Sequence, residues 1–177
     1  MARFLFNLIA FQIGWFACVW AGARGLPWVG TGIALAIVAL HLHGLPRPRA
    51  ELVLILLVGV LGLLLDSAPV AFGLIDYASG TFYQGLAPNW IVAMWLLFAT
   101  LLNVSLYWLR GRLVLGALLG ALGAPLAYYA GARLGGADFA EPVWQGLALL
   151  ALNWALAMPL MLVMARRFDG TVVGTGR

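Results

Sequence analysis

Few side chains in this sequence could do chemistry, and the most informative lie in an apolar run, Trp90 to Leu109, that holds no charge. If this run is helical, Thr100, Asn103 and Tyr107 share one face, because they are spaced i, i+3 and i+7. A buried amide such as that of Asn103 must be hydrogen-bonded to another helix or to water. The spacing therefore predicts a polar position inside an apolar assembly.

Other polar side chains fall within or beside neighbouring apolar runs. Together they form a candidate polar pocket that opens toward the cytoplasmic side: Asn7, Gln12, His41, Thr100, Asn103, Tyr107 and Asn153. These side chains either form interhelical hydrogen bonds of about 0.6–2 kcal/mol each, which fix the register of the helices, or line a binding site. The amides are not ionisable, whereas proton and ion pathways usually use carboxylates or histidine, which favours the structural role.

Asp66 is the acidic residue closest to an apolar run, and two roles are open to it. It can end a helix at the outer interface, or it can attract a cation or an amine. His41 and His43 are spaced i, i+2, so they point apart on a helix, and no cysteine or nearby carboxylate completes a metal site. No motif for a nucleophile, a zinc protease, a phosphate-binding loop or a dinucleotide is present. The sequence therefore predicts no catalytic residue, no metal and no cofactor.

The composition places these residues in a membrane protein. Of 177 residues, 64% are hydrophobic and 9% are charged, and the mean hydropathy is +1.02. These fractions lie far outside those of soluble domains. The single cysteine, Cys18, cannot form an intramolecular disulfide. The first apolar run, Phe4 to Ala23, is longer than the roughly 7–15 residues of a signal-peptide core, so we expect a retained helix.

Crossing a bilayer core about 30 Å thick takes about 20 apolar residues. Six segments meet this condition, so we predict an all-α polytopic membrane protein: a bundle of six transmembrane helices in one domain, residues 1–167, with a flexible cytoplasmic tail, 168–177. The third segment is the least secure, because Glu51 and Asp66 bracket its apolar core. The segments are 4–23, 26–42, 50–68, 90–109, 113–132 and 142–165.

The arginines predict the orientation, because basic residues are retained on the cytoplasmic side. With the N-terminus inside, the inner segments hold Arg3, Arg47, Arg49, Arg110, Arg112, Arg166, Arg167 and Arg177, and the outer segments hold only Arg24 and Arg133. Trp20, Trp28 and Tyr128 fall near the opposite ends of their helices, where aromatic rings settle at the interface. Both termini are therefore expected in the cytoplasm. The positive charge serves topology and lipid headgroups, not nucleic-acid binding.

The segment from Asp66 to Asn89 is the one long connection. It is too short in apolar residues to cross the membrane, so we expect a loop or short helix in the outer interface, either re-entrant or acting as a lid.

Small residues recur at every fourth position in two of the predicted helices. Gly14, Cys18 and Gly22 form one stripe, and Gly116, Gly120 and Ala124 form another. Such stripes allow close approach of a second helix. They serve either packing within the chain, which is the more common use, or docking of a partner subunit.

Three stretches resemble a known family. FQIGWFACVWAG (11–22), FATLLNVSLYWL (98–109) and GALGAPLAYYAGARLG (120–135) are similar to those of a bacterial membrane-protein family catalogued as domain of unknown function number 2878. The resemblance implies a multi-pass inner-membrane protein, with a lean toward lipid metabolism.

Two functions from different classes follow from these observations. The first is an accessory factor in membrane-lipid or fatty-acyl modification, whose partners would be membrane lipids and a peripheral enzyme or partner membrane subunit. The second is a small-solute binding or transport subunit, because the size and six helices resemble the substrate-binding components of energy-coupling-factor vitamin transporters. The sequence indicates neither the ligand nor the oligomeric state.

Overall fold

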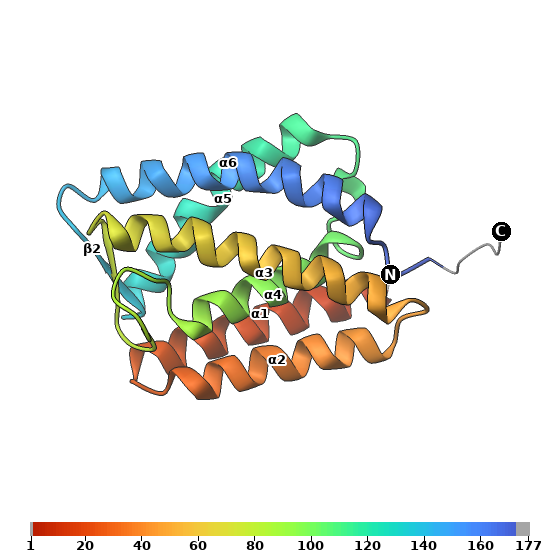
Figure 1. The fold of residues 1–177 in the computed structure, drawn as a ribbon, viewed down its shortest axis with the longest axis horizontal. Helices are drawn as coiled ribbons and strands as arrows, with labels where there is room; N and C mark the ends of the chain where they lie inside the picture. Colours follow the sequence, from red (N-terminus) through yellow and green to blue (C-terminus); the bar gives the residue numbers. More distant parts are fainter. Residues whose placement is uncertain (1, 173–177) are drawn as a thin grey trace.

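The computed structural model describes residues 2–172, and six α-helices make up most of them (Figure 1). The helices are α1 (Ala2–Ala23), α2 (Pro27–His43), α3 (Pro48–Ala71), α4 (Asn89–Leu102), α5 (Leu113–Arg133) and α6 (Trp144–Arg167). A short 3-10 helix, η1 (Tyr107–Leu109), and two strands, β1 (Ile75–Tyr77) and β2 (Ala137–Phe139), lie between them. The fold is therefore helical, with six helices as expected and a small strand pair that the sequence did not predict.

Local sequence sets where several helices begin and end. α2 and α3 begin at a proline, whose fixed φ suits the first helical position and whose missing N–H would have no partner there. α1 is followed by Gly25 and α5 by Gly135, with positive φ values of 71° and 86°. A glycine adopts this conformation without strain, and it lets the next N–H, of Leu26, donate to the carbonyl of Ala21 at 2.9 Å.

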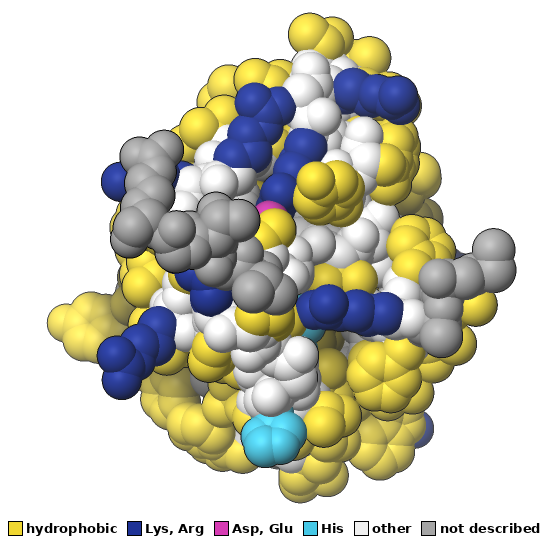
Figure 2. Space-filling view, turned by 90° about the vertical axis from the view of Figure 1, so that its right-hand side faces the viewer, with side chains coloured by type: hydrophobic (Ala, Val, Ile, Leu, Met, Phe, Trp, Pro, Cys, Tyr) yellow, Lys and Arg dark blue, Asp and Glu magenta, His cyan; other side chains and the backbone are white. Residues whose placement is uncertain are grey.

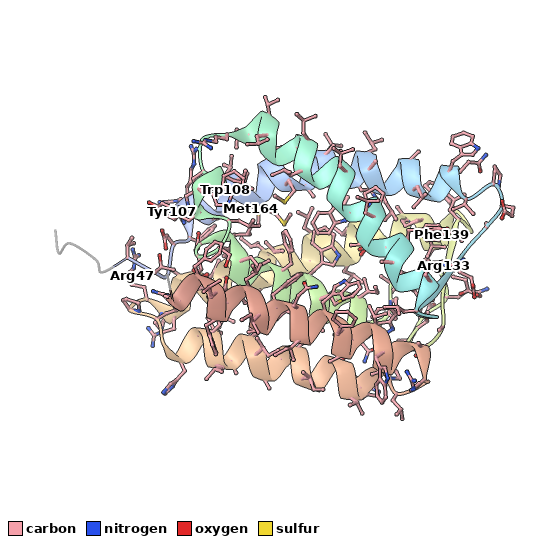
Figure 3. The ribbon with its side chains drawn as sticks, turned by 180° about the vertical axis from the view of Figure 1, so that it is seen from behind. Arg47, Tyr107, Trp108, Arg133, Phe139 and Met164 are labelled. Carbon is pink, nitrogen blue, oxygen red and sulfur yellow. The ribbon has the colours of Figure 1, made fainter. Side chains whose placement is uncertain are left out.

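Successive helices run in opposite directions, so α1 begins and α6 ends at the same end of the molecule (Figure 1). We call this the arginine end, because basic side chains are spread over it (Figure 2). Figure 3 shows Arg47 and Tyr107 at this end, and Arg133 and Phe139 at the other. The second end, which carries the strands, is called the ribbon end.

β1 and β2 form an antiparallel ribbon in which Tyr77 pairs with Ala137. Before the ribbon, α3 continues past Asp66 to Ala71, so the predicted start of the loop at Asp66 was wrong. After β1, the Ser79 hydroxyl donates to the carbonyl of Gly22 at 2.6 Å, and the Trp90 indole N–H donates to the carbonyl of Ser79 at 2.9 Å. These bonds attach the connection to the ends of α1 and α4, so that it covers the ribbon end.

α4 is shorter than the sequence predicted. It ends at Leu102, and Asn103 caps it, so the predicted helix through residue 109 was wrong. The chain then turns back and forms η1. The Ser105 hydroxyl lies 3.2 Å from the carbonyl of Phe4, so this turn is held against the start of α1. Polar groups in this turn compete with helical hydrogen bonds, whereas a hydropathy count registers only the apolar residues around them.

Glycines mark the closest helix contacts. The two predicted stripes both face inward, with Gly14, Cys18, Gly22, Gly116, Gly120 and Ala124 all buried. A Cβ on Gly120 would lie 2.5 Å from the backbone oxygen of Trp154, so the backbone of α5 comes close to that of α6 there. A Cβ on Gly30 would lie 2.7 Å from Cys18 Cα, which places α2 equally close to α1. Both stripes are thus used within the chain.

The outer surface of the helices is apolar. α1, α3, α5 and α6 are long and apolar enough to cross a membrane, while α2 and α4 are shorter apolar helices. Phe6, Leu64 and Leu126 are 60%, 65% and 70% exposed, respectively. Soluble proteins do not expose contiguous apolar surface on this scale, so the four long helices indicate insertion in a membrane.

The contact at Gly120 yields a stability prediction with a control on the same helix. Gly120→Ala should lower the free energy of unfolding by about 1–3 kcal/mol, because the new methyl group meets the α6 backbone. Gly123→Ala should be neutral or stabilising by up to about 1 kcal/mol, because nothing lies within 4 Å of its added Cβ. Thermal unfolding of the two purified variants in detergent measures the difference. Equal unfolding temperatures would contradict the close contact.

Candidate functional site

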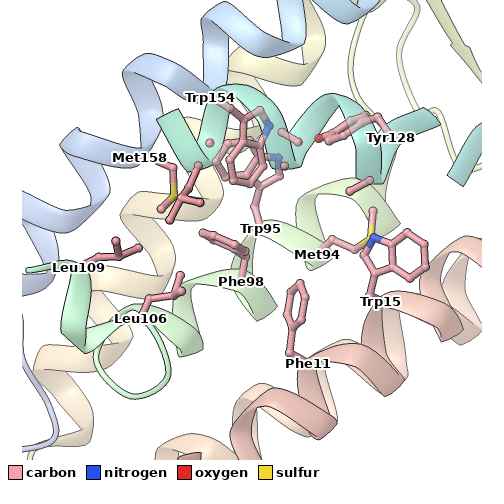
Figure 4. A pocket seen from close by; sticks show the side chains of 15 residues that line it. Phe11, Trp15, Met94, Trp95, Phe98, Leu106, Leu109, Tyr128, Trp154 and Met158 are labelled. Atoms are coloured by element: carbon pink, nitrogen blue, oxygen red, sulfur yellow. The ribbon is translucent and has the colours of Figure 1, made fainter. Parts of the chain in front are cut away.

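A cavity of about 300 Å³ lies between α1, α4, α5 and α6 (Figure 4). Its volume is at the lower limit of the range, about 300–1,000 Å³, that small-molecule sites occupy. Almost all of its lining is apolar, and it is lined by Phe11, Trp15, Met94, Trp95, Phe98, Leu106, Leu109, Leu119, Gly120, Gly123, Ala124, Ala127, Tyr128, Trp154 and Met158. The cavity exists because α5 presents small residues where α4 and α6 present rings.

Aromatic side chains form a connected wall in this cavity. The rings of Trp95 and Trp154 are stacked, with centroids 4.4 Å apart and an interplanar angle of 25°. Phe98 meets Trp154 edge-on at 5.1 Å, and Phe11 meets Phe98 at 6.0 Å. Such pairs favour one another beyond their buried area, so the wall is held in one arrangement.

The cavity opens on the side of the molecule, not at either end. On its α5 side Leu119 and Gly123 are exposed, and on its α1 side Phe11 and Trp15 are only half-buried. α5 packs mainly against α6, which leaves the space toward α1 free. If the helices span a membrane, this opening faces hydrocarbon.

Asp66 lies behind the aromatic wall and is fully buried. Its Oδ2 atom accepts hydrogen bonds from the Trp95 indole N–H, at 2.7 Å, and from the Tyr128 hydroxyl. Its Oδ1 atom has no hydrogen-bond partner among residues 2–172. The expected interfacial position of Tyr128 is therefore wrong for its side chain, which points inward to the acid and lines the cavity.

A second, smaller cavity of about 30 Å³ continues from the first toward the ribbon end. It shares Trp15, Met94 and Tyr128 with the larger one and adds Tyr77 of β1. The Tyr77 hydroxyl is buried without a hydrogen-bond partner in the described part of the chain. Burial, and then the nearby charge of Asp66, raise the pKa of Tyr77 well above its ordinary value, so the hydroxyl stays protonated.

The arginine end holds a separate pocket of about 180 Å³. Asn7, His41 and Thr100 from the predicted polar set line it, and Arg3 lies at its edge. The Asn7 amide donates to the Thr100 carbonyl at 3.2 Å and accepts from the Ser105 hydroxyl at 2.6 Å. The amide's hydrogen-bonding capacity is thus largely used within the chain.

Asn103 belongs to a neighbouring hydrogen-bond network around Glu51, whose side chain is fully buried. The Asn103 amide donates to Glu51 Oε2 at 2.7 Å and accepts from Arg110. The backbone N–H of Gly170 donates to the same oxygen at 2.9 Å, and His41 Nε2 lies 3.2 Å from Glu51 Oε1. The network ties the segment after α6 to α2, α3 and the end of α4.

Asp169 completes the network through an ion pair with Arg110, at 2.8 Å. Burial alone would raise the pKa of Asp169, but hydrogen bonds from Thr171 and the charge and hydrogen bond of Arg110 outweigh it. They lower the pKa below the ordinary 3.8. Residues 168–172, which were predicted to be a flexible tail, are therefore held against the helices, whereas residues 173–177 of that tail lie outside the described residues.

The predicted polar set is divided by the structure. Gln12 is exposed on the outside of α1, and Tyr107 lies on η1 with 53% of its surface exposed, so neither faces the other members. Asn153 is buried near the opposite end, where its amide donates to the Leu65 carbonyl at 2.9 Å. Within residues 2–172, no three His, Cys, Asp or Glu side chains are grouped as metal ligands would be.

Sequence reasoning missed the aromatic cavity and the role of Glu51. Trp15, Trp95 and Trp154 look like ordinary apolar residues in a chain with eight tryptophans. Glu51 enters the sequence analysis only as a charge that brackets the third apolar segment, whereas in the structure it faces inward to Asn103. A usable signal was present: both acids of α3 lie on one face, since fifteen residues separate positions 51 and 66 and four helical turns are about 14.4 residues.

Comparison with known proteins yields one family. The family model described as "Protein of unknown function (DUF2878)" matches residues 4–160, which include all three stretches that carried the resemblance, and so confirms it. No curated protein and no solved structure matches the chain.

The network around Glu51 predicts unequal effects for two Asn→Leu variants. Asn103→Leu should destabilise the fold by about 2–5 kcal/mol, because it removes a donor from a buried carboxylate and an acceptor from Arg110. Asn153→Leu removes one bond to a backbone carbonyl and should cost about 1 kcal/mol. Unfolding in detergent, followed by tryptophan fluorescence, compares them. Effects of equal size would contradict the network.

The Arg110–Asp169 pair predicts a dependence on acid. Because the pKa of Asp169 is lowered in the folded chain, its contribution is complete above 3.8 and is lost as the pH falls through the lowered value. Hydrogen exchange of the Thr171 amide, corrected for the intrinsic rate, should be constant from about pH 5 upward and should accelerate in stronger acid. Asp169→Asn should weaken protection at neutral pH and remove the acid step. The same acid step in both proteins would contradict this assignment.

Proposed function

The chain belongs to the DUF2878 family, and we propose that it is a bacterial inner-membrane protein that binds the apolar chain of a lipid-like molecule. In this proposal all six helices cross the membrane and both termini lie in the cytoplasm. The bound molecule is handed to, or received from, an enzyme of membrane-lipid or fatty-acyl modification. The chain itself then acts as an accessory factor.

The orientation is supported by the distribution of charge. Arg47, Arg49, Arg110 and Arg112 sit at the arginine end together with the basic end of α6, whereas among the described arginines only Arg24 and Arg133 sit at the ribbon end. Basic residues are retained on the cytoplasmic side, so the arginine end would face the cytoplasm. α4 is about 21 Å long and does not cross the hydrocarbon by itself. The turn after α4 would complete this crossing, and its buried position inside the protein makes that acceptable.

The observation that carries the binding proposal is the apolar cavity with its opening on the side. A polar solute arriving from water would need an opening at one end of the molecule, whereas a lipid can enter through the side opening from within the bilayer. Its lining offers many apolar and aromatic contacts, and the polar groups of its described lining are the Tyr128 hydroxyl and the indole N–H groups of three tryptophans, Trp15, Trp95 and Trp154. If the chain instead has the alternative function, that of a small-solute binding or transport subunit, this lining favours an apolar solute.

Filling the cavity tests the proposal. Gly123→Leu should be tolerated, because nothing lies within 4 Å of its Cβ, yet the new side chain would occupy part of the opening. Gly32→Leu is the matched control: Gly32 is also exposed in a helix, has no neighbour within 4 Å and lies away from the cavity. Lipids that copurify with each protein in a mild detergent are identified by mass spectrometry.

We expect a lipid or acyl species bound to the unmodified chain and to Gly32→Leu, and its loss by about tenfold from Gly123→Leu. The same species should accumulate or disappear in cells that lack the gene. A bound lipid unaffected by Gly123→Leu, together with an unchanged acyl and headgroup profile in those cells, would refute the proposed function.

A further inference from the structure

We propose that the Tyr128 end of the cavity binds a positively charged amine or quaternary ammonium group that is attached to an apolar chain. The inference rests on the proposed function and adds the chemical class of the polar group to it. Three features of the described residues carry it: a buried acid without a basic partner, an aromatic lining, and the absence of a basic side chain from that lining.

The first feature is that Asp66 is buried without a basic partner. The ion pairs formed within residues 2–172 are His41–Glu51 and Arg110–Asp169, so Asp66 has no basic partner there. Only one of its oxygens accepts hydrogen bonds, from Trp95 and Tyr128. A buried carboxylate is costly unless it is paired, and within a membrane such a group usually marks a functional position. A cation bound in the neighbouring cavity would supply a positive charge to balance the carboxylate.

The contrast with Glu51 on the same helix sharpens this point. Glu51 has donors on both oxygens, from Asn103 and Gly170 on one and from His41 on the other, and Arg110 lies one hydrogen bond farther away. The chain therefore compensates one buried acid of α3 with its own groups. It leaves Oδ1 of Asp66 without any partner among the residues described.

The second feature is the cavity lining in front of the acid. Trp95 and Tyr128 each contact the cavity and each donate to Asp66, so the carboxylate stands one hydrogen bond behind the cavity surface. Trp15, Phe98 and Trp154 add further rings around the same space. Aromatic faces attract cations within about 6 Å of the ring centroid, and desolvated sites of this kind recognise quaternary ammonium groups.

The third feature disfavours the opposite charge. Among the described residues, no arginine or histidine lines the cavity. The Trp95 N–H and the Tyr128 O–H are already donated to Asp66. The Trp154 N–H and the Tyr77 O–H have no partner among the described residues, but both are neutral donors and neither supplies the positive charge that a carboxylate or phosphate would need. An anion would also meet the charge of Asp66. A neutral hydroxyl could donate to the Tyr128 oxygen, but it would gain nothing from the acid behind it.

Three short amphiphiles of equal chain length test the proposal: hexyltrimethylammonium, hexanol and hexanoate. The full chain is purified in a neutral maltoside detergent at pH 7, and the rise in its unfolding temperature with ligand concentration gives the affinity. We expect the ammonium compound to bind at least about tenfold more tightly than hexanol, and hexanoate to bind most weakly. Asp66→Asn, which keeps an acceptor for Trp95, should reduce the preference for the cation to about twofold or less.

If Asp66→Asn does not fold, Gly123→Leu and Gly32→Leu decide the location of the site: the preference for the cation should be lost in the first and kept in the second. Equal binding of the ammonium compound and hexanol, tighter binding of hexanoate, or a preference that survives Gly123→Leu would overturn the inference and leave apolar binding intact. Failure of all three ligands to bind, with no lipid copurifying, would overturn the proposed function as well.

Discussion

A carboxylate that leaves water must find hydrogen-bond donors or a countercharge, and α3 carries two such groups on its buried side, Glu51 and Asp66. They are about 22 Å apart along the helix, one near each end. Each determines what its neighbours do: Glu51 gathers Asn103, His41 and the backbone of Gly170, and Asp66 gathers Trp95 and Tyr128. α3 thereby fixes α2, α4, α5 and the segment after α6 relative to itself.

The two ends of α3 solve the same problem differently. At the arginine end, water and basic side chains are close, and the chain supplies a network that ends in the Arg110–Asp169 pair. At the ribbon end the donors are an indole and a phenol, both neutral, and both belong to rings that line a cavity. The first arrangement holds the segment after α6 against α2, α3 and the end of α4. The second leaves a negative charge beside an apolar space, which is why the cavity and not the inner pocket is the better candidate for ligand binding.

The cavity itself follows from unequal side-chain size on facing helices. On α5, Gly120 allows the backbone to approach α6, and Gly120, Gly123 and Ala124 leave space toward α1. On α4 and α6, Trp95 and Trp154 stack and cannot fill that space because each holds the other in place. If the small residues of α5 served only for packing, α5 would lie close to both α6 and α1 and the cavity would be filled. Instead α5 runs obliquely across the other helices, and the cavity stays open (Figure 3).

Hydropathy and charge by themselves indicated a helical protein with apolar helices suited to a membrane, and they located α1, α2, α5 and α6 to within a few residues, because burial in hydrocarbon depends on composition summed over a whole segment. The family followed from three local stretches. The end of α4 at Leu102, the strand pair, and the inward course of Glu51, Asp66 and Tyr128 were decided by the tertiary structure. The physical reason is that a polar group in an apolar run predicts only that the group needs a hydrogen-bond partner. Which partner it finds depends on residues far along the chain, as Asp66 and Tyr128 show.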